Sequence, residues 1–290
     1  MTLNPNAQVD TGQVREAGRG AGGGLSRIPI PINGGGGVIG LIVLALLVVG
    51  GIVGGNQFLN DDGSQGGDLS CPAGTQSDVR CRNALYVNSI QKYWQTALPQ
   101  AFGTPYQAAD TVFYEQAVNT GCGAAESGVG PFYCPEDDLV YIDVSFWNEL
   151  SSRFGAPGQF AQAYVLAHEY GHHVQDLVGT EATVRRQMER DPANQNALSV
   201  MLELQADCYA GVWAKHAAQT TDANGQPIFS SLTQQDIDQA LQAAAAVGDD
   251  AIQGSNANES NFTHGTSAQR QQWFSTGYGG GDPKACNTFG

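Results

Sequence analysis

The sequence predicts a mainly helical α+β domain, and the apolar patterns of four segments carry this prediction. Residues 166–177 and 197–215 repeat apolar side chains at the spacing of an amphipathic helix. Residues 111–118 and 139–146 alternate apolar and polar side chains as half-buried strands do. The strand-like segments are short and few, so we expect a small sheet beside a helical body.

The first 55 residues divide into a polar segment and an apolar one. Residues 1–37 are rich in Gly, Asn and Arg without apolar periodicity, so we expect a flexible tail. Residues 38–55 are uncharged over a length that can cross a bilayer. The long segment before this run, and the absence of an A-x-A cleavage pattern after it, favour a retained transmembrane helix. A cleaved signal sequence and a buried core helix are the alternatives.

Charges beside the apolar run predict its orientation. Arg15, Arg19 and Arg27 precede it, whereas Asp61 and Asp62 follow it. The positive-inside rule then predicts a single-pass membrane protein with a cytoplasmic N-terminus and an extracytoplasmic main domain. The chain has a net charge of −15. An acidic body of this kind argues against nucleic acid as a partner.

All six cysteines lie beyond the apolar run, and an even number suits disulfides in an oxidising compartment. No C-x-x-C pair occurs, which disfavours a structural zinc site. The short glycine-containing segment between Cys122 and Cys134 is a plausible loop for a disulfide to close. Cys71 with Cys81, and Cys208 with Cys286, then follow by nearness and exclusion. The sequence does not choose rigorously among the possible pairings.

The rest of the chain gives further local signals. Residues 56–70 form a Gly/Asp/Ser-rich linker, and the folded domain is expected over residues 71–290. Residues 84–98 have helical periodicity and are followed by Pro99, which we expect to end the helix. Residues 140–144 are either an edge strand that binds an extended substrate or an ordinary core strand.

Two helices are expected near the C-terminus. Thr233 and Asp236 have the spacing of a capping box, and the apolar stripe after them ends at Gly248. Residues 267–276 fit a short helix, with Gly277 just beyond its end.

The most informative stretch is A-H-E-Y-G-H-H-V-Q at residues 167–175. On a helix, His168 and His172 lie on one face one turn apart, so both imidazoles can bind one metal ion. Glu169 is then placed to reach a water molecule on that metal. His173 points about 100° away from His172 and is expected behind the ligands or at the surface. Gly171 is unfavourable in a helix, which predicts a close approach of another backbone or of substrate.

A catalytic zinc ion needs a third protein ligand. Residues 197–215 form the next long predicted helix and contain Glu203 and Asp207 four positions apart, on one face. Such a pair is commonly a solvated helix face. Here it lies in a largely apolar segment after the histidine motif, so we expect Glu203 to bind the metal. Asp207 is spaced to accept the remaining N–H of a ligand histidine.

These motifs together resemble a known family. A-H-E-Y-G-H-H-V-Q, L-E-L-Q-A-D-C-Y-A-G-V-W and T-H-G-T-S-A-Q-R-Q-Q-W-F-S-T-G-Y, behind an apolar N-terminal run, are similar to the bacterial neutral zinc metallopeptidases. The resemblance covers the chain from the apolar run to the C-terminus. It implies a zincin-like domain with zinc on His168, His172 and Glu203, and Glu169 as the catalytic acid/base.

A more distant likeness to membrane gluzincin peptidases concerns the late His-x₅-Arg element. His264 precedes the predicted short helix that bears Arg270. We expect His264 to stabilise the oxyanion formed by attack on a peptide carbonyl, and Arg270 to act beside it. The alternatives are a loop role for His264 and a structural ion pair for Arg270.

The expected function is that of a zinc-dependent endopeptidase acting on a peptide or protein at the membrane. Two other functions stay open: a metal-binding or scaffolding module without turnover, and a zinc amidase acting on cell-wall peptides. The presence of Glu169 disfavours the scaffold, because a structural site does not need an acid that is not a ligand.

Overall fold

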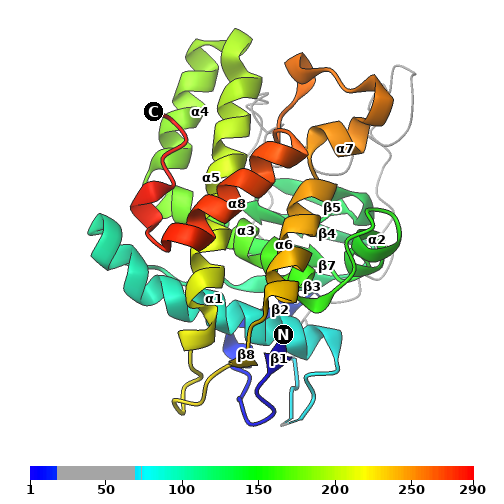
Figure 1. Cartoon of the computed structure of the whole chain (residues 1–290), viewed down its shortest axis with the longest axis vertical. Helices are drawn as coiled ribbons and strands as arrows, with labels where there is room; N and C mark the ends of the chain where they lie inside the picture. Colours follow the sequence, from blue (N-terminus) through cyan, green and yellow to red (C-terminus); the bar gives the residue numbers. More distant parts are fainter. Residues whose placement is uncertain (18–68, 73) are drawn as a thin grey trace, which may run out of the picture.

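The computed structural model describes residues 1–17, 69–72 and 74–290, which form a mainly helical α+β fold (Figure 1). The helices are α1 (Val79–Phe102), α2 (Phe146–Ser152), α3 (Gln159–Leu177), α4 (Thr180–Arg190), α5 (Gln195–His216), α6 (Gln234–Ala246), α7 (Asp249–Gln253) and α8 (Ser267–Gly280). The strands are β1 (Thr2–Leu3), β2 (Val14–Glu16), β3 (Thr111–Tyr114), β4 (Ala117–Thr120), β5 (Gly123–Glu126), β6 (Phe132–Cys134), β7 (Leu139–Asp143) and β8 (Phe229–Ser231). The prediction of a mainly helical α+β fold is confirmed.

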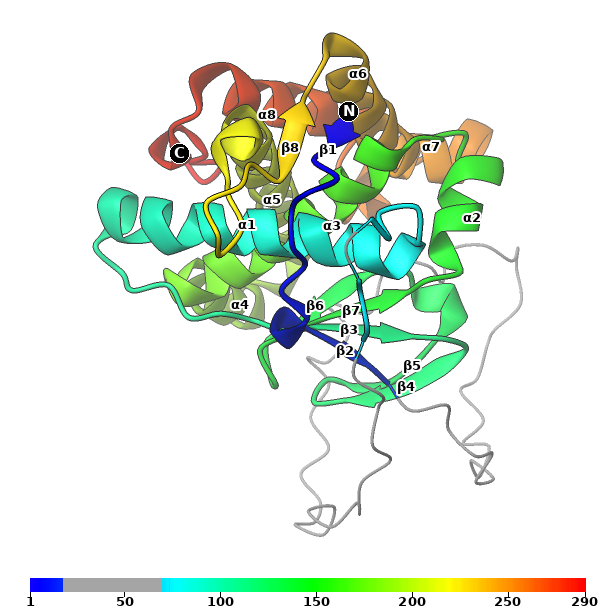
Figure 2. The ribbon, with the colours of Figure 1, turned by 90° about the horizontal axis from the view of Figure 1, so that it is seen from below.

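The main sheet has four strands in the order β2-β3-β7-β6. β2, β3 and β7 are parallel, and β6 runs antiparallel to β7. Two further antiparallel pairs are β4 with β5 and β1 with β8. Helices α1 and α3 lie between this sheet and helices α6 and α8 (Figure 2). Helix α3 therefore occupies the centre of the molecule, where it also packs against α5.

Strand β7 lies inside the sheet. Val140 and Tyr141 pair with β3 on one side and with β6 on the other, whereas Ile142 and Asp143 pair with β3. Val140 and Ile142 are buried in the main core, and Tyr141 stacks on Phe132 in a second apolar cluster. The expectation that residues 140–144 form an edge strand is wrong. The alternative, a core strand, is confirmed.

Several predicted ends of elements differ from the observed ones. Helix α1 continues through Pro99 to Phe102 and ends at Gly103, which has a φ of 72° and donates its N–H to the Pro99 carbonyl. The strand expected at residues 111–118 breaks after Tyr114, because Gln116 has a φ of 73°. Helix α4 had no counterpart among the expected elements. The predicted capping box at the start of α6 is confirmed.

Helix α8 does not stop before Gly277, as expected, but continues to Gly280. The reason is close packing against α5. A Cβ atom on Gly277 would lie 2.0 Å from the Cys208 carbonyl oxygen, and one on Gly211 would lie 2.1 Å from the Phe274 carbonyl oxygen. Gly277 therefore allows the backbone of α5 to approach α8 closely, and it does not end the helix.

Gly171 serves the contact between α3 and α5. A Cβ atom there would lie 2.9 Å from both Cα and the carbonyl oxygen of Ala206. The expected close approach of another backbone at Gly171 is confirmed. The consequence is that the motif-bearing face of α3 lies directly against the helix that carries Glu203 and Asp207.

Residues 1–17 do not form the flexible tail that we expected over residues 1–37. β2 joins the main sheet beside β3, β1 pairs with β8, and the side chains of Ala7 and Val14 are buried. The composition did not reveal this, because the segment uses backbone hydrogen bonds and only a few apolar side chains. The predicted span at residues 38–55 and the linker at 56–70 lie outside the described residues, apart from Leu69 and Ser70. Of the helices in the described part of the chain, none combines the length and apolar character needed to cross a membrane.

The three expected disulfides are confirmed. Cys71 is bonded to Cys81, Cys122 to Cys134 and Cys208 to Cys286, with Cα–Cα distances of 5.5, 5.8 and 5.5 Å. Cys122–Cys134 closes the segment that contains β5, and Cys208–Cys286 ties the C-terminal residues to the middle of α5.

The packing of α8 on α5 predicts opposite effects for two glycines of α8. Gly277→Ala should destabilise the protein by about 1–3 kcal/mol or more, because its methyl group would meet the backbone of α5. Gly279→Ala is the matched control: nothing lies within 4 Å of its Cβ position, and Ala is favoured over Gly in a helix by up to about 1 kcal/mol. Urea unfolding measures both. Equal effects of the two substitutions would contradict the packing argument.

Candidate metal centre

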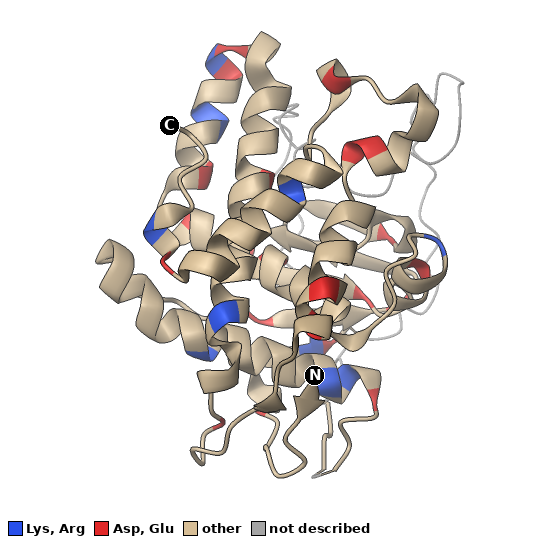
Figure 3. Ribbon diagram, viewed as in Figure 1, with Lys and Arg blue, Asp and Glu red and all other residues tan. Residues whose placement is uncertain are grey.

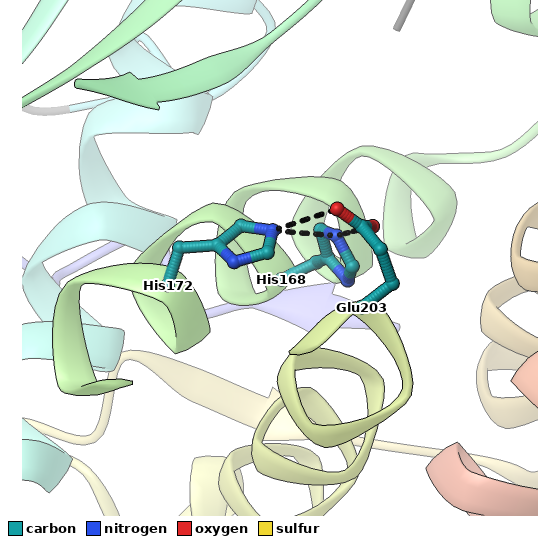
Figure 4. Close-up of side chains that lie close together, drawn as sticks. All are labelled: His168, His172 and Glu203. Atoms are coloured by element: carbon teal, nitrogen blue, oxygen red, sulfur yellow. Dashed lines mark hydrogen bonds and ion pairs between the residues drawn. The ribbon is translucent and has the colours of Figure 1, made fainter. Parts of the chain in front are cut away.

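Helix α3 presents the histidine motif to the interior of the molecule. His168 and Glu169 are buried, and the side chain of His172 is partly exposed. Glu203 reaches the same place from α5 and is also buried. Figure 4 shows the imidazole of His172 and the carboxylate of Glu203 converging beside His168.

The three predicted ligands meet in one cluster. One ligand atom from each of His168, His172 and Glu203 lies within 4.8 Å of the others. The two histidine Nε2 atoms are 3.2 Å apart, and they lie 3.1 Å and 3.5 Å from the two carboxylate oxygens of Glu203. Ligand atoms about 2.0–2.1 Å from a tetrahedral zinc ion are about 3.3 Å apart, so this spacing fits zinc. Two imidazoles and one carboxylate also leave a fourth position for water.

Asp207 holds His168 in place. Its carboxylate lies 2.8 Å from His168 Nδ1 and also accepts a hydrogen bond from the Tyr164 hydroxyl. The other imidazole nitrogen, Nε2, therefore faces the cluster. Asp207 is fully buried, yet its pKa stays below the usual range because the charge and hydrogen bonds of Arg270 and His168 outweigh the effect of burial. The predicted contact of Asp207 with His168 is present, and the role of His168 as a metal ligand stays a prediction.

Gln175 holds the second histidine. His172 Nδ1 lies 2.9 Å from Gln175 Oε1, and the amide nitrogen of Gln175 donates to the Leu202 carbonyl at 2.7 Å and to Gln205 at 3.1 Å. Hydrogen bonds of this kind fix the orientation of a ligand imidazole and its tautomer. Gln175 and Tyr164 were missed from sequence. Their spacing from the ligands, three residues after His172 and four before His168, is the signal that could have found them.

Arg270 is paired with Asp207. Its Nε and one terminal nitrogen lie 2.7 Å and 3.0 Å from the two oxygens of that carboxylate. The same guanidinium is 3.8 Å from Glu203 and is almost fully buried. These contacts correspond to the structural ion pair that was one of the two expectations for Arg270. They place the guanidinium behind the ligand His168.

His173 does not join the cluster. Its Nε2 lies 2.7 Å from the Gln107 carbonyl oxygen, and its Nδ1 lies 3.2 Å from the Tyr133 hydroxyl. Burial lowers the pKa of His173, which favours its neutral imidazole. The expectation that it is not a ligand agrees with this position, and its role is to join α3 to strand β6.

His264 lies in a loop that is built around one carboxylate. Asp249 Oδ2 accepts the backbone N–H groups of Thr263, His264 and Gly265 at 2.8, 2.6 and 2.9 Å. Its Oδ1 lies 3.3 Å from His264 Nδ1. Asp249 was not found from sequence, since it is remote from His264 in the chain and carries no motif.

Neighbouring charges and burial shift the pKa values of the side chains in the site. Although burial opposes it, the carboxylates of Glu203 and Asp249 raise the pKa of His264. Burial raises the pKa of Glu169, the one acid of the histidine motif at residues 167–175. A buried carboxyl with a raised pKa is suited to accept and return a proton near neutral pH.

The site is a candidate metal centre in which two histidines and a glutamate are placed to act as ligands, with Glu169 beside them. Residues 6–289 match the family described as "Putative neutral zinc metallopeptidase", and the chain belongs to this family.

Relatives in two bacterial groups are similar to this chain. "Uncharacterized protein YpfJ" of Escherichia coli K12 is 48% identical over 195 residues, which cover 66% of this chain and 65% of that protein, just under two thirds of its length. "Uncharacterized protein Mb2605" of Mycobacterium bovis is 44% identical over 237 residues, which cover 79% of this chain and 78% of that protein. No solved structure matches the chain.

The protonation of His168 predicts how metal binding depends on pH. Although burial opposes it, Asp207 and Glu203 raise the pKa of His168 to about 10 in the metal-free protein. A zinc ligand must be deprotonated, so Zn²⁺ has to displace this proton. Between pH 6 and 8 the apparent Zn²⁺ affinity should therefore rise by about tenfold per pH unit.

Titration calorimetry in two buffers of different ionisation enthalpy measures the proton released. His216→Gln is the control, because His216 lies at the far end of α5 and should leave the release unchanged. A Zn²⁺ affinity that does not depend on pH would show that His168 is neutral before zinc binds.

Proposed function

We propose that the protein is a zinc-dependent endopeptidase. The observation that carries the proposal is Glu169. It is buried beside three residues that fit zinc, it is adjacent to the ligand His168 in the chain, and it is not one of the ligands. A metal-binding or scaffolding module has no use for such a carboxyl group, whereas hydrolysis needs a base for water.

The roles of the side chains follow from their positions. Bound zinc would supply a Lewis acid that polarises a carbonyl group and lowers the pKa of a water molecule. Glu169 takes the proton of the attacking water and later delivers it to the leaving amine nitrogen. His264, whose pKa is raised by the carboxylates of Glu203 and Asp249, would donate a hydrogen bond to the oxyanion that develops on the carbonyl oxygen. Asp207, Arg270 and Gln175 keep the ligand imidazoles oriented.

An extended peptide or protein segment is the proposed substrate. Strand β7 is internal, but β6 is an edge strand of the same sheet and packs against α3. Tyr133 of β6 also contacts His173 on that helix. A peptide that pairs with the open edge of β6 would run alongside the motif-bearing helix.

The partners and location are part of the same proposal. The three disulfides support an extracytoplasmic domain, and the apolar character of residues 38–55 supports a contact with the membrane. Nucleic acid is not a proposed partner. The net charge of −15 disfavours it, and Figure 3 shows the Lys and Arg of the described residues spread over several helices with Asp and Glu among them.

Two substitutions test the assignment of base and ligand. Glu169→Gln should keep bound zinc and lose peptidase activity, because the amide cannot accept the water proton. Glu203→Ala should lose both, because a third ligand is removed. Metal content by plasma emission and a peptide-library assay, with and without chelator, measure the two properties on the full chain.

The outcome that would exclude this mechanism is a Glu169→Gln protein as active as the parent. Zinc retained in full by Glu203→Ala would require another third ligand. If the chelator-sensitive activity is directed at cell-wall peptides and not at proteins, the protein is a zinc amidase.

The loop around Asp249 predicts a graded effect on catalysis. His264→Ala should lower kcat by about 10² to 10³ with little change in KM, because its hydrogen bond forms mainly in the transition state. Asp249→Asn should lower kcat less, since the loop keeps a side chain that accepts N–H groups but loses the charge beside His264.

Asp250→Asn is the matched control. Asp250 is next in the chain and accepts hydrogen bonds from the Ser267 N–H and hydroxyl at 2.7 Å each, so its carboxylate holds the first residue of α8. It should change stability but not kcat. If Asp249→Asn and Asp250→Asn have the same kcat, Asp249 does not act through His264.

A further inference from the structure

The first residues of the chain run along the domain and connect parts of it that are far apart in sequence (Figure 2). Asn4 N–H donates to the Ile228 carbonyl at 2.9 Å, next to strand β8. Gln8 N–H donates to Asp222 at 2.8 Å. Asp10 and Asn88 exchange two hydrogen bonds, at 2.9 Å and 3.0 Å, which fix the segment on helix α1.

The segment then enters the main sheet. Val14, Arg15 and Glu16 form β2 and lie opposite Thr111, Val112 and Phe113 of β3. The Ala17 N–H donates to the Phe113 carbonyl at 2.8 Å. Two ion pairs flank the strand: Arg15 with Asp110, and Glu16 with Arg80 of α1 at 2.9 Å. The backbone hydrogen bonds, the buried side chains and the ion pairs are therefore all consistent with one register of β2 against β3.

Without this strand, β3 would be the edge of the sheet. Its N–H and C=O groups on that side would be unpaired, and an open parallel edge is prone to pair with other chains. The contacts that residues 1–17 make with α1, with the chain beside β8 and with Asp222 would be lost at the same time. A segment with this many specific partners is part of the folded domain.

We propose that residues 1–17 are an integral part of this domain, to which they contribute strand β2. They would then lie on the same side of the membrane as residues 69–290. A chain that crosses a membrane once between residues 17 and 69 would separate β2 from β3. The fold and the single-pass orientation expected from Arg15, Arg19 and Arg27 therefore exclude each other. The proposal does not depend on the proposed peptidase activity.

Thiol labelling of the full chain in intact cells tests this proposal. All six native cysteines are in disulfides, so an added cysteine is the only free thiol. The side chain of Arg15 is 62% exposed, and Arg15→Cys should be accessible to a membrane-impermeant maleimide. Gln100→Cys, at an exposed position of α1, reports on the main domain.

We expect the two cysteines to be labelled to the same extent, whichever compartment holds the domain. Labelling of both only after permeabilisation would leave the strand proposal intact and would overturn the proposed extracytoplasmic location. Labelling of Gln100→Cys in intact cells, with Arg15→Cys labelled only after permeabilisation, would overturn the proposal.

A cysteine pair tests the register. Arg15 and Val112 are directly opposite, and neighbouring strands are about 4.8 Å apart, within the range that a disulfide spans. Arg15→Cys/Val112→Cys should form this disulfide in cells. In the control Glu16→Cys/Val112→Cys the two side chains point to opposite faces of the sheet, and no link should form. Linkage in neither protein, or in both equally, would show that β2 does not occupy this position.

Discussion

The buried carboxylate of Asp207 is the group on which the metal centre depends. It is fully buried and contacts His168 and Tyr164 of α3 and Arg270 of α8, so it joins three helices at one point. Burying a carboxylate is unfavourable unless its charge and hydrogen-bonding capacity are satisfied. Arg270 provides the compensating charge. The ion pair of Asp207 with Arg270, which lies in the core, therefore also holds His168 in position.

That ion pair requires the helices to lie unusually close together. Gly171 brings α3 against Ala206, and Gly277 brings α8 against the carbonyl of Cys208, so the two contacts flank Asp207 on α5. With larger residues at either position, the carboxylate could not reach both His168 and Arg270. The glycines thus act on the metal centre through the distances between helices.

Much of the centre could be predicted because its information is local. Helical spacing places His168, Glu169 and His172 correctly, and the same rule applies to Glu203 with Asp207. Asp249 could not be found, since it reaches His264 through a loop contact and no spacing rule. The fold likewise has features that local patterns predict and features that they do not. Helices α1, α3, α5 and α6 were recognised from their periodicity, although α4 was not. Sheet order, the central place of β7 and the docking of residues 1–17 depend on pairings between distant segments.

The C-terminal residues complete the support of the second ligand. The Cys208–Cys286 disulfide holds the end of the chain against α5, and the carbonyl of Cys286 accepts a hydrogen bond from Gln205 at 2.8 Å. Gln205 contacts Gln175, which orients His172. His168 is therefore held by an ion pair and His172 by a chain of neutral amides that ends at a disulfide. Because both imidazoles are already held by these contacts, zinc binding at the proposed site would order few side chains.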